Sequence, residues 1–314
     1  MNKSILPSEF VEKIKDLYPE AETHNMLLES LKSKATTFRV NTLQADPEKV
    51  IKSLESKGFE LKQSQFSEIA YELITKDKKT LIQTSEYQNG EIYLQSFASQ
   101  IPVLVLDPKA EEKILDLTAA PGSKTSQISA ITKQSSELHA NDVNTIRLQK
   151  LKHNLQKLGV NKNITIHNRH GSDLVNDLSK DYFDKILVDA PCSGEATFNI
   201  DYPKSYSYWS KDRVSKFHER QTELLEAALG MLKPEGSLVY STCTFDVLEN
   251  EKVIQSILQK FPDQVEVESI SIPNIETLET LPEFKGTDIE KTIRLKPNHN
   301  TESFFIAKLK KCTK

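Results

Sequence analysis

The spacing of apolar residues divides the chain into a short opening region and a longer region in which strands and helices alternate. In the opening region, the pattern predicts helices at residues 7–18, 20–33 and 46–59 and a strand at residues 36–43. The third helix begins at an Asp-Pro pair and ends near Gly58, both of which are typical helix boundaries. Residues 85–96 are expected to form a loop and give the best domain boundary, so we expect a small α/β domain at residues 1–94.

From about residue 95, apolar strands alternate with amphipathic helices. The pattern predicts strands at residues 112–118, 137–142, 163–168, 183–191, 237–242, 291–296 and 303–310, helices at 126–132, 144–159, 211–232 and 247–261, and turns at 119–125 and 233–236. The helix at 144–159 has Leu148, Leu151, Leu155 and Leu158 on one face and ends at Gly159. This alternation is typical of a doubly wound α/β domain with a mostly parallel sheet, here residues 95–314.

Composition limits the function classes. The chain has 314 residues, a hydrophobic fraction of 37% and no apolar run long enough to span a membrane. No secretion signal is evident at the N-terminus, and three cysteines, an odd number, fit a reducing cytosol, so we expect a cytoplasmic protein. The histidines and cysteines lack the spacing of a metal centre, so we expect none. Because the net charge is −4, nucleic-acid binding would require a local basic patch.

A turn of small residues after the first strand of the second domain indicates a ligand site. The run LDLTAAPGSKT, residues 115–125, lacks the glycine spacing of a phosphate-binding loop and that of a dinucleotide fingerprint. Asp142 ends the next strand, where an acid accepts hydrogen bonds from a ribose. Asp142 could instead cap the following helix. Combined with the turn, the acid favours a nucleoside cofactor without a diphosphate, such as S-adenosylmethionine.

Three motifs in order, DLTAAPGSKT (116–125), DAPCSGEATF (189–198) and STCTF (241–245), resemble those of the Nop/Sun family of RNA cytosine-C5 methyltransferases. The runs FRVNTL (38–43) and RLKPNHNTESFFIAKL (294–309) are also similar to that family. The resemblance implies a Rossmann-like methyltransferase domain preceded by a small RNA-binding domain. It further implies S-adenosylmethionine as methyl donor and ribosomal or transfer RNA as acceptor. We expect a monomer without an obligate protein partner.

The resemblance also implies roles for individual residues. Those assigned to the cofactor are Thr118, Ala119, Ala120, Pro121, Gly122, Ser123, Lys124, Asp142, Arg147, Asp173 and Asp189. Those assigned to catalysis are Cys243 as nucleophile, Cys192 as the residue that assists product release, and Asp189 as the acid near N3 of the cytosine. Those assigned to RNA contact are Arg39 and Lys124.

Methylation at cytosine C5 explains why two cysteines would follow two strands. Cytosine C5 becomes nucleophilic when a thiolate adds to C6, and the adduct must later be broken. The residue chemistry alone does not decide which cysteine attacks. We expect the helix at 247–261 to lower the pKa of Cys243 through its N-terminal dipole. Cys312, in a terminal basic segment, is interpreted as an ordinary small hydrophobic residue.

Several positions depart from the family pattern. Thr118 stands where cysteine is frequent, and Ser123, Ala196 and Ser303 stand where glycine is common. Alanine at 196 would be strained if that position required a positive φ. Two other functions remain open on the same motifs: a DNA cytosine-C5 methyltransferase, in which the Pro-Cys cysteine attacks, and a non-catalytic RNA-binding scaffold. Trp209 is expected to pack, while Tyr202, Tyr206 and Tyr208 could pack or stack on bases.

Overall fold

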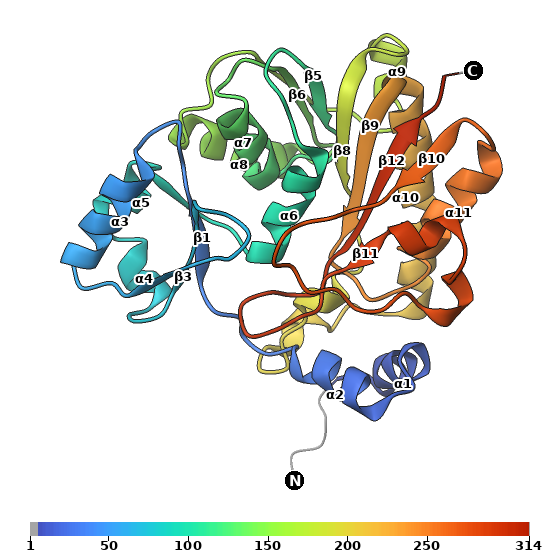
Figure 1. Cartoon of the computed structure of the whole chain (residues 1–314), viewed down its shortest axis with the longest axis horizontal. Coiled ribbons are helices and arrows are strands. Elements are labelled where there is room, and N and C mark those ends of the chain that lie inside the picture. Colours follow the sequence, from blue (N-terminus) through green and yellow to red (C-terminus); the bar gives the residue numbers. More distant parts are fainter. Residues whose placement is uncertain (1–5, 314) are drawn as a thin grey trace.

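Two β-sheets organise the protein (Figure 1). The structure, a computed structural model, describes residues 6–313. The smaller sheet contains β1 (Thr37–Val40), β2 (Leu61–Gln63), β3 (Ala70–Leu73) and β4 (Ile92–Leu94), and the larger contains β5 (Lys113–Asp116), β6 (Glu137–Asn141), β7 (Ile164–His167), β8 (Phe183–Asp189), β9 (Leu232–Thr242), β10 (Val265–Glu268), β11 (Ile293–Arg294) and β12 (Phe305–Lys311).

Helices cover both sheets and join successive strands. Their bounds are α1 (Ser8–Leu17), α2 (Ala21–Glu29), α3 (Pro47–Ser56), α4 (Lys78–Leu81), α5 (Ser85–Gln88), α6 (Phe97–Leu106), α7 (Ser123–Ile131), α8 (Thr145–Lys157), α9 (Leu174–Asp177), α10 (Lys211–Met231) and α11 (Glu251–Lys260), with short 3₁₀ turns η1 (Glu195–Thr197), η2 (Pro203–Ser205), η3 (Pro282–Phe284) and η4 (Asp288–Lys291).

The small sheet is antiparallel, with strand order β2-β3-β1-β4. Helix α3 begins as expected, because Asp46 accepts a hydrogen bond from the backbone N–H of Lys49 at 3.2 Å and Pro47 occupies the first turn. The expected loop at 85–96 is wrong, since it contains α5 and the strand β4. A three-residue strand is too short to show alternation, and its partner β1 lies far away in the sequence.

The large sheet has the order β10-β12-β9-β8-β5-β6-β7, with β11 paired to β12. Strands β9, β8, β5, β6 and β7 are parallel, and β12 is antiparallel to both of its neighbours in that order. The expected doubly wound, mostly parallel sheet is therefore confirmed. The apolar face of α8 is confirmed too, because its four leucines are buried.

Several element boundaries differ from expectation, for example at the end of α2, which stops at Glu29, and at the start of α7, which begins at Ser123. Residues 233–236, expected as a turn, lie within β9, where Glu235 has φ 64° and the pairing with β8 shifts register. Helix α11 begins at Glu251 rather than Val247, so residues 244–250 form a non-helical segment after Cys243. Helix α6 is an element that periodicity did not reveal, because it is buried on nearly all sides and contains Pro102.

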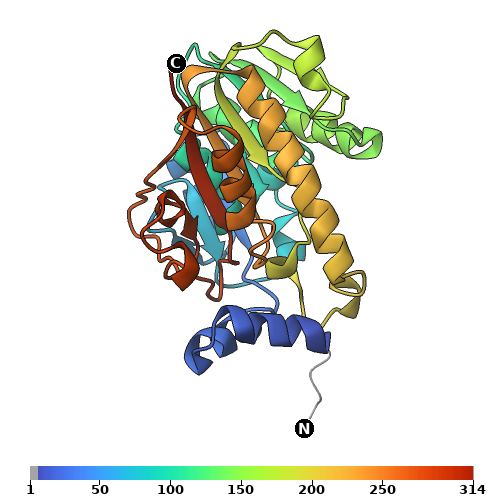
Figure 2. The ribbon, with the colours of Figure 1, turned by 90° about the vertical axis from the view of Figure 1, so that its right-hand side faces the viewer.

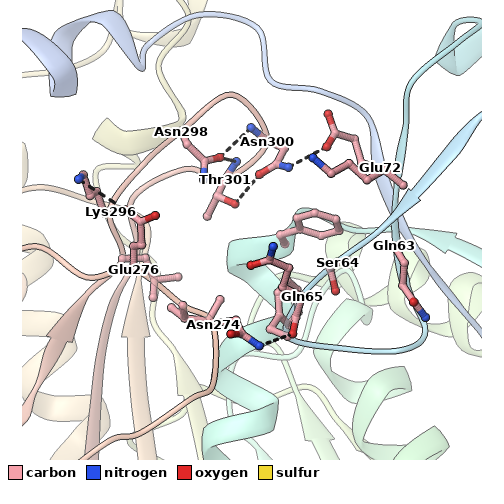
Figure 3. A pocket seen from close by; sticks show the side chains of 15 residues that line it. Gln63, Ser64, Gln65, Glu72, Asn274, Glu276, Lys296, Asn298, Asn300 and Thr301 are labelled. Carbon is pink, nitrogen blue, oxygen red and sulfur yellow. Dashed lines mark hydrogen bonds and ion pairs between the residues drawn. The ribbon is translucent and has the colours of Figure 1, made fainter.

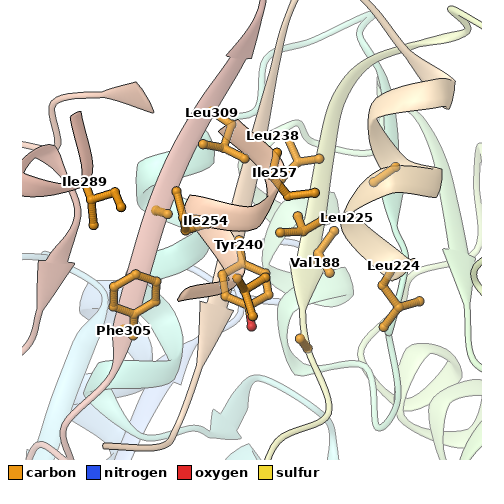
Figure 4. Packing of buried hydrophobic residues seen from close by; sticks show 14 of the residues in the cluster. Val188, Leu224, Leu225, Leu238, Tyr240, Ile254, Ile257, Ile289, Phe305 and Leu309 are labelled. Atoms are coloured by element: carbon orange, nitrogen blue, oxygen red, sulfur yellow. The ribbon is translucent and has the colours of Figure 1, made fainter. Parts of the chain in front are cut away.

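Helices α1 and α2 pack on the large sheet rather than on the small one. Phe10, Ile14 and Leu27 are fully buried in the cluster that also holds residues of β8, β9, α10 and α11. Figure 2 shows both helices beneath the lower end of α10, and Figure 4 shows part of the cluster around Tyr240 and Phe305. The opening helices therefore help to build the core of the larger domain. Within residues 6–313, no helix is long and apolar enough to cross a membrane.

Candidate active site

The two motif cysteines meet at the carboxyl ends of neighbouring parallel strands. Strands β8 and β9 pair in a register that sets Asp189 opposite Ser241, so the loops that follow both strands lie together. The Sγ atoms of Cys192 and Cys243 are 3.4 Å apart. Ligands of such sheets bind beyond the carboxyl ends of the strands, so the cysteine pair lies at the expected edge. Cys312 lies elsewhere, where its backbone N–H donates to the carbonyl of Gln264.

The surroundings of Cys192 disfavour its thiolate form. The pKa of Cys192 is raised well above its usual range, first by its hydrogen bond with Cys243, then by burial and by the nearby charges of Cys243 and Glu249. Cys192 is thus a protonated thiol at neutral pH. A protonated Cys192 can donate to a thiolate at Cys243 but is a poor nucleophile itself.

Asp189 is held in place at the end of β8 by contacts on both carboxylate oxygens. Lys124 Nζ lies 2.6 Å from Asp189 Oδ2, and the hydroxyl of Ser241 donates to Oδ1 at 2.8 Å. Lys124 also contacts Ser99 Oγ at 2.9 Å, and Thr118 donates to the backbone carbonyl of Asp189 at 2.8 Å. The small-residue turn and the cysteine loop are therefore joined through Asp189.

The turn at 117–122 lies beside the acid that ends β6. Asp142 is buried, and its carboxylate accepts from the backbone N–H of Ala120 at 3.3 Å and of Asn144 at 2.8 Å. Arg147 covers this acid, with Nη1 3.3 Å from Oδ2, and also donates to the carbonyl of Ala120. Helix α8 is capped by Asn144, not by Asp142. The alternative in which Asp142 is only a helix cap is therefore not supported.

Glycine is required at the end of this turn. Gly122 has φ 103°, and a Cβ there would lie 2.8 Å from Leu151 Cδ1. The close packing brings the start of α7 against α8. Beneath the turn, Asp116 accepts from Thr125 at 2.6 Å, while its second oxygen is buried without a partner, and burial raises its pKa to about 7.

Two residues assigned by resemblance lie apart from these contacts. Asp173 follows β7 at the same edge of the sheet, is exposed and occupies the N-cap position of α9 without a capping hydrogen bond from its side chain. Arg39 was expected to face RNA, but it is only 1% exposed. Its guanidinium donates to Gln95 at 2.9 Å and to Ser126 at 2.7 Å, joining the small sheet to α7. This cation is buried between the small sheet and α7, and its assignment to RNA contact stays a prediction.

Comparison with known proteins gives the family. The family model described as "16S rRNA methyltransferase RsmB/F" matches residues 103–310, which is more than half of the chain. The chain belongs to this family. A second model, described as the ferredoxin-like domain of RsmF/B-like methyltransferases, matches residues 6–76. The family expected from the motifs is thus confirmed.

Individual RsmB/F relatives resemble the chain over most of its length. Ribosomal RNA small subunit methyltransferase F of Shewanella sediminis is 34% identical over 312 residues, 98% of this chain and 63% of the relative. The tRNA (cytosine(49)-C(5))-methyltransferase of Pyrococcus abyssi is 37% identical over 281 residues, 88% of either chain. A methyltransferase homolog from Pyrococcus horikoshii has a similar crystal structure, with TM-score 0.82 and 32% identity over 99% of this chain and all of that one. The chain spans about 63% of the length of the small-subunit RNA methyltransferases that it matches.

The departures from the RsmB/F pattern fit the structure without strain. Thr118 uses its hydroxyl to bind the carbonyl of Asp189, and Ser123 is the first residue of α7. The backbone of Ala196 does not adopt a positive φ, whereas Gly194 has φ 72°. Ser303 is buried next to β12.

A buried polar cluster under the cysteine loops was not expected from the sequence. Glu195 is fully buried, and its carboxylate accepts from Trp209 Nε1 at 2.5 Å and Thr244 Oγ1 at 3.1 Å. Lys13 of α1 forms an ion pair with Glu195 and a second one with Asp246 at 2.8 Å. Lys13 therefore connects the loop of one cysteine to the loop of the other. An acid within the otherwise small and apolar run 190–198 was the available signal.

Glu249 makes a second link between the loops. It accepts from the backbone N–H of Ser193 at 2.9 Å, from Gln221 at 3.0 Å and from Thr244 at 3.3 Å. Burial is the main cause that raises the pKa of Glu249 to about 7.

Trp209 packs as expected, against Phe10, with the two ring centroids 5.6 Å apart.

The aromatic run before α10 divides by exposure. Tyr206 is buried against Phe198, with ring centroids 5.9 Å apart, so it packs. Tyr202 and Tyr208 are exposed. Of the three tyrosines in this run, Tyr202 and Tyr208 could therefore still stack on bases, whereas Tyr206 could not.

Proposed function

We propose that this chain is an RNA cytosine-C5 methyltransferase that uses S-adenosylmethionine and acts on a structured ribosomal or transfer RNA. The observation that carries the proposal is the pair of Sγ atoms 3.4 Å apart, beside the Lys124–Asp189 ion pair. The names of its relatives, an rRNA and a tRNA methyltransferase, support the substrate class.

The residues around the turn fit the cofactor. Asp142 presents a carboxylate beside Ala119 and Ala120, whose small side chains allow close approach of a nucleoside, and carboxylate oxygens can accept from ribose hydroxyls. When bound, S-adenosylmethionine would supply an electrophilic methyl group. We propose that residues 118–124, Asp142, Arg147, Asp173 and Asp189 hold it, with Arg147 moving off Asp142.

Three residues of the chain would then carry out separate steps of the reaction. Cys243 adds as thiolate to C6 of the flipped cytosine, and the negative charge passes through the ring to C5 and N3. Asp189, positioned by Lys124 and Ser241, would act beside N3 in its protonated form, donating its proton to N3 as that charge builds and taking it back when the adduct breaks. After C5 has gained its methyl group, its proton passes to solvent water, the electron pair of that C–H bond restores the C5–C6 double bond, and the C6–Cys243 bond breaks with the thiolate as leaving group. Cys192, a protonated thiol, donates a hydrogen bond to that departing sulfur.

We further propose that residues 1–94 form the RNA-contacting domain and residues 95–314 the methyltransferase domain, while α1 and α2 pack on the second. The ranges of the two family models, 6–76 and 103–310, support a boundary between them. We also propose that the protein acts as a monomer in the cytosol, where its three free cysteines would stay reduced. Sedimentation at micromolar concentration tests whether the protein is a monomer.

One gel tests the function and the cysteine assignment. Unmodified transcripts of small-subunit rRNA and tRNA are incubated with S-adenosylmethionine and either Cys192→Ala or Cys243→Ala, with Cys312→Ala as control. We expect Cys192→Ala to methylate and then stall as a covalent protein–RNA complex, visible as a slow band under denaturing conditions. Cys243→Ala should form neither adduct nor 5-methylcytosine, and Cys312→Ala should behave as wild type.

The two alternative functions predict different results on the same gel. The DNA-type arrangement predicts trapping by Cys243→Ala, and duplex DNA would then be the better substrate. A scaffold protein predicts no adduct and no 5-methylcytosine from any variant. Circular dichroism of each variant separates loss of chemistry from loss of folding.

A further inference from the structure

A cavity of about 180 Å³ lies between the two sheets (Figure 3). One wall is the segment from β2 toward β3, including Gln65 and Phe66, and the other is formed by residues 274–276 and 295–301. Asn274 Nδ2 joins the walls by donating to the carbonyl of Gln65 at 2.9 Å. The cavity therefore belongs to the junction between the small sheet and the catalytic domain.

Two parts of the lining are connected to residues of the active site. Phe97, at the start of α6, is two residues from Ser99, which contacts Lys124. The other wall continues from Thr301 into β12, whose first residue pairs with Thr242, the neighbour of Cys243. Phe66 and Cys243 pack against the same hydrophobic cluster. A chain that crosses the carboxyl edge of the sheet could reach both places.

The lining of the cavity combines an apolar floor with amide groups. Phe66 and Phe97 meet edge to face with centroids 5.2 Å apart, and buried Leu295 lies beside them. Figure 3 shows the amide of Gln65 pointing into the cavity. An amide presents a donor and an acceptor together, which matches the edge of a nucleobase, and aromatic side chains suit its faces.

The volume of the cavity and the charges in its lining limit the kinds of ligand that it can bind. A volume of 180 Å³ is smaller than the roughly 300–1,000 Å³ of cavities that hold drug-sized ligands, so it has room for one flat ring system. Glu72 accepts from Asn300 at 2.8 Å and lies 3.1 Å from His299 Nε2, and the remaining lone pairs of its carboxylate can accept from an exocyclic amino group. Lys62 and Lys296 are exposed at the lining, where ammonium groups can contact phosphates, although Lys296 also pairs with Glu276 of the same lining at 3.5 Å.

We propose that this cavity binds one unpaired nucleobase of the RNA substrate, close to the target cytosine. The proposal rests on the proposed function and names a second contact point for the same RNA. Holding a neighbouring base out of its stack would help to expose the target cytosine, which must itself leave its stack to reach Cys243. The base is read through its edge by Gln65 and, through its amino group, by Glu72.

The strand β2 region offers a matched pair of variants. Gln65→Ala removes the amide in the cavity, whereas the side chain of Gln63 turns away and contacts the carbonyl of Glu68 at 2.7 Å and the hydroxyl of Tyr71 at 3.2 Å. On the transcript that wild type methylates, we expect Gln65→Ala to lower kcat/KM about tenfold through KM, since one lost hydrogen bond of this kind is worth about 1.4 kcal/mol. Gln63→Ala should stay within about twofold. Equal effects of the two variants would overturn the proposal.

A substrate series makes the test specific for a base. Single abasic sites are placed at each nucleotide flanking the methylated cytosine. One position should reproduce the loss seen with Gln65→Ala, and combining the two should cost nothing further. Losses that multiply at every position would contradict the inference.

Cross-linking tests the cavity without relying on activity. Wild type is irradiated at 254 nm with small-subunit rRNA and tRNA transcripts, and its tryptic peptides are analysed by mass spectrometry. We expect a nucleotide on the peptide of residues 63–76, which contains Gln65 and Phe66. A nucleotide there without methylation would refute only the proposed function, whereas methylation without that cross-link would refute only the base cavity. The absence of any cross-link would refute the cavity as well.

Discussion

Replacing Lys13 with methionine should destabilise the protein although Lys13 lies far from both cysteines in the sequence. Its ammonium lies between the carboxylates of Glu195, which is fully buried, and Asp246, which is 7% exposed. Removing one partner of a buried ion pair costs about 3–5 kcal/mol, because the remaining charge is left without compensation. Since about a fifth of the Lys13 side chain is exposed, we expect the lower end, about 3 kcal/mol.

The effect should depend on pH in a defined direction. Burial raises the pKa of Glu195 even with Lys13 present, so without Lys13 this acid will be protonated in the folded state up to a higher pH. A protonated Glu195 needs no counter-charge. The folded variant therefore binds protons that the unfolded chain has lost, and its stability falls as pH rises. We expect the difference between wild type and Lys13→Met to be larger at pH 8 than at pH 5.

Urea unfolding followed by tryptophan fluorescence measures this directly, because Trp209 is the single tryptophan and donates to Glu195. Lys15→Met, an exposed position on the same helix, is the matched control and should change the free energy of unfolding by less than about 0.5 kcal/mol. Adding Glu195→Gln to Lys13→Met should recover more than half of the loss. A loss below about 1 kcal/mol, or an equal loss in the control, would refute the reasoning.

Three further outcomes are expected. Burial raises the pKa of Glu249 from 4.5 to about 7, so its protonation stabilises the fold at low pH, and about 3 kcal/mol should be lost as pH rises from 4.5 to 7; urea titrations should find this decline reduced in Glu249→Gln, and parallel pH profiles would contradict it. Arg39→Ala should cost about 2–3 kcal/mol by leaving buried partners unsatisfied, yet should leave the salt dependence of RNA binding unchanged, whereas a shallower slope would indicate a phosphate contact. Asp142→Ala should weaken S-adenosylmethionine binding at least tenfold in calorimetry, while Asp16→Ala, an exposed position on α1, serves as the comparison; unchanged affinity in the first variant would refute the ribose contact.

The parts of the fold that could be predicted are those whose signals are local. Four leucines on one face fix α8, and strand-end motifs imply that Cys192 and Cys243 meet, because parallel neighbours end at the same edge. Helix α6 gave no periodic signal, since a helix buried all round has no polar face. Strand β4 was missed because pairing, rather than its three residues, makes it a strand.

The supporting contacts of the site could not be predicted, because they join remote segments. Lys13 and Glu195 are separated by 182 positions, and an amphipathic helix does not reveal which surface will cover its apolar face. The burial of Arg39 could not be predicted either. An arginine in a motif was taken to face RNA, yet its neighbours Gln95 and Ser126 supply the polar partners that permit burial.

The packing of α1 against the large sheet has a consequence for synthesis on the ribosome. Phe10 and Ile14 emerge well before the residues that cover them, which lie in β8, β9, α10 and α11, about 200 positions later. At a synthesis rate of about 5–20 residues per second, these apolar side chains remain uncovered for roughly 10–40 s. During that interval the nascent helix is a target for chaperones. A version of the chain in which α1 is moved to the C-terminus by circular permutation should need them less.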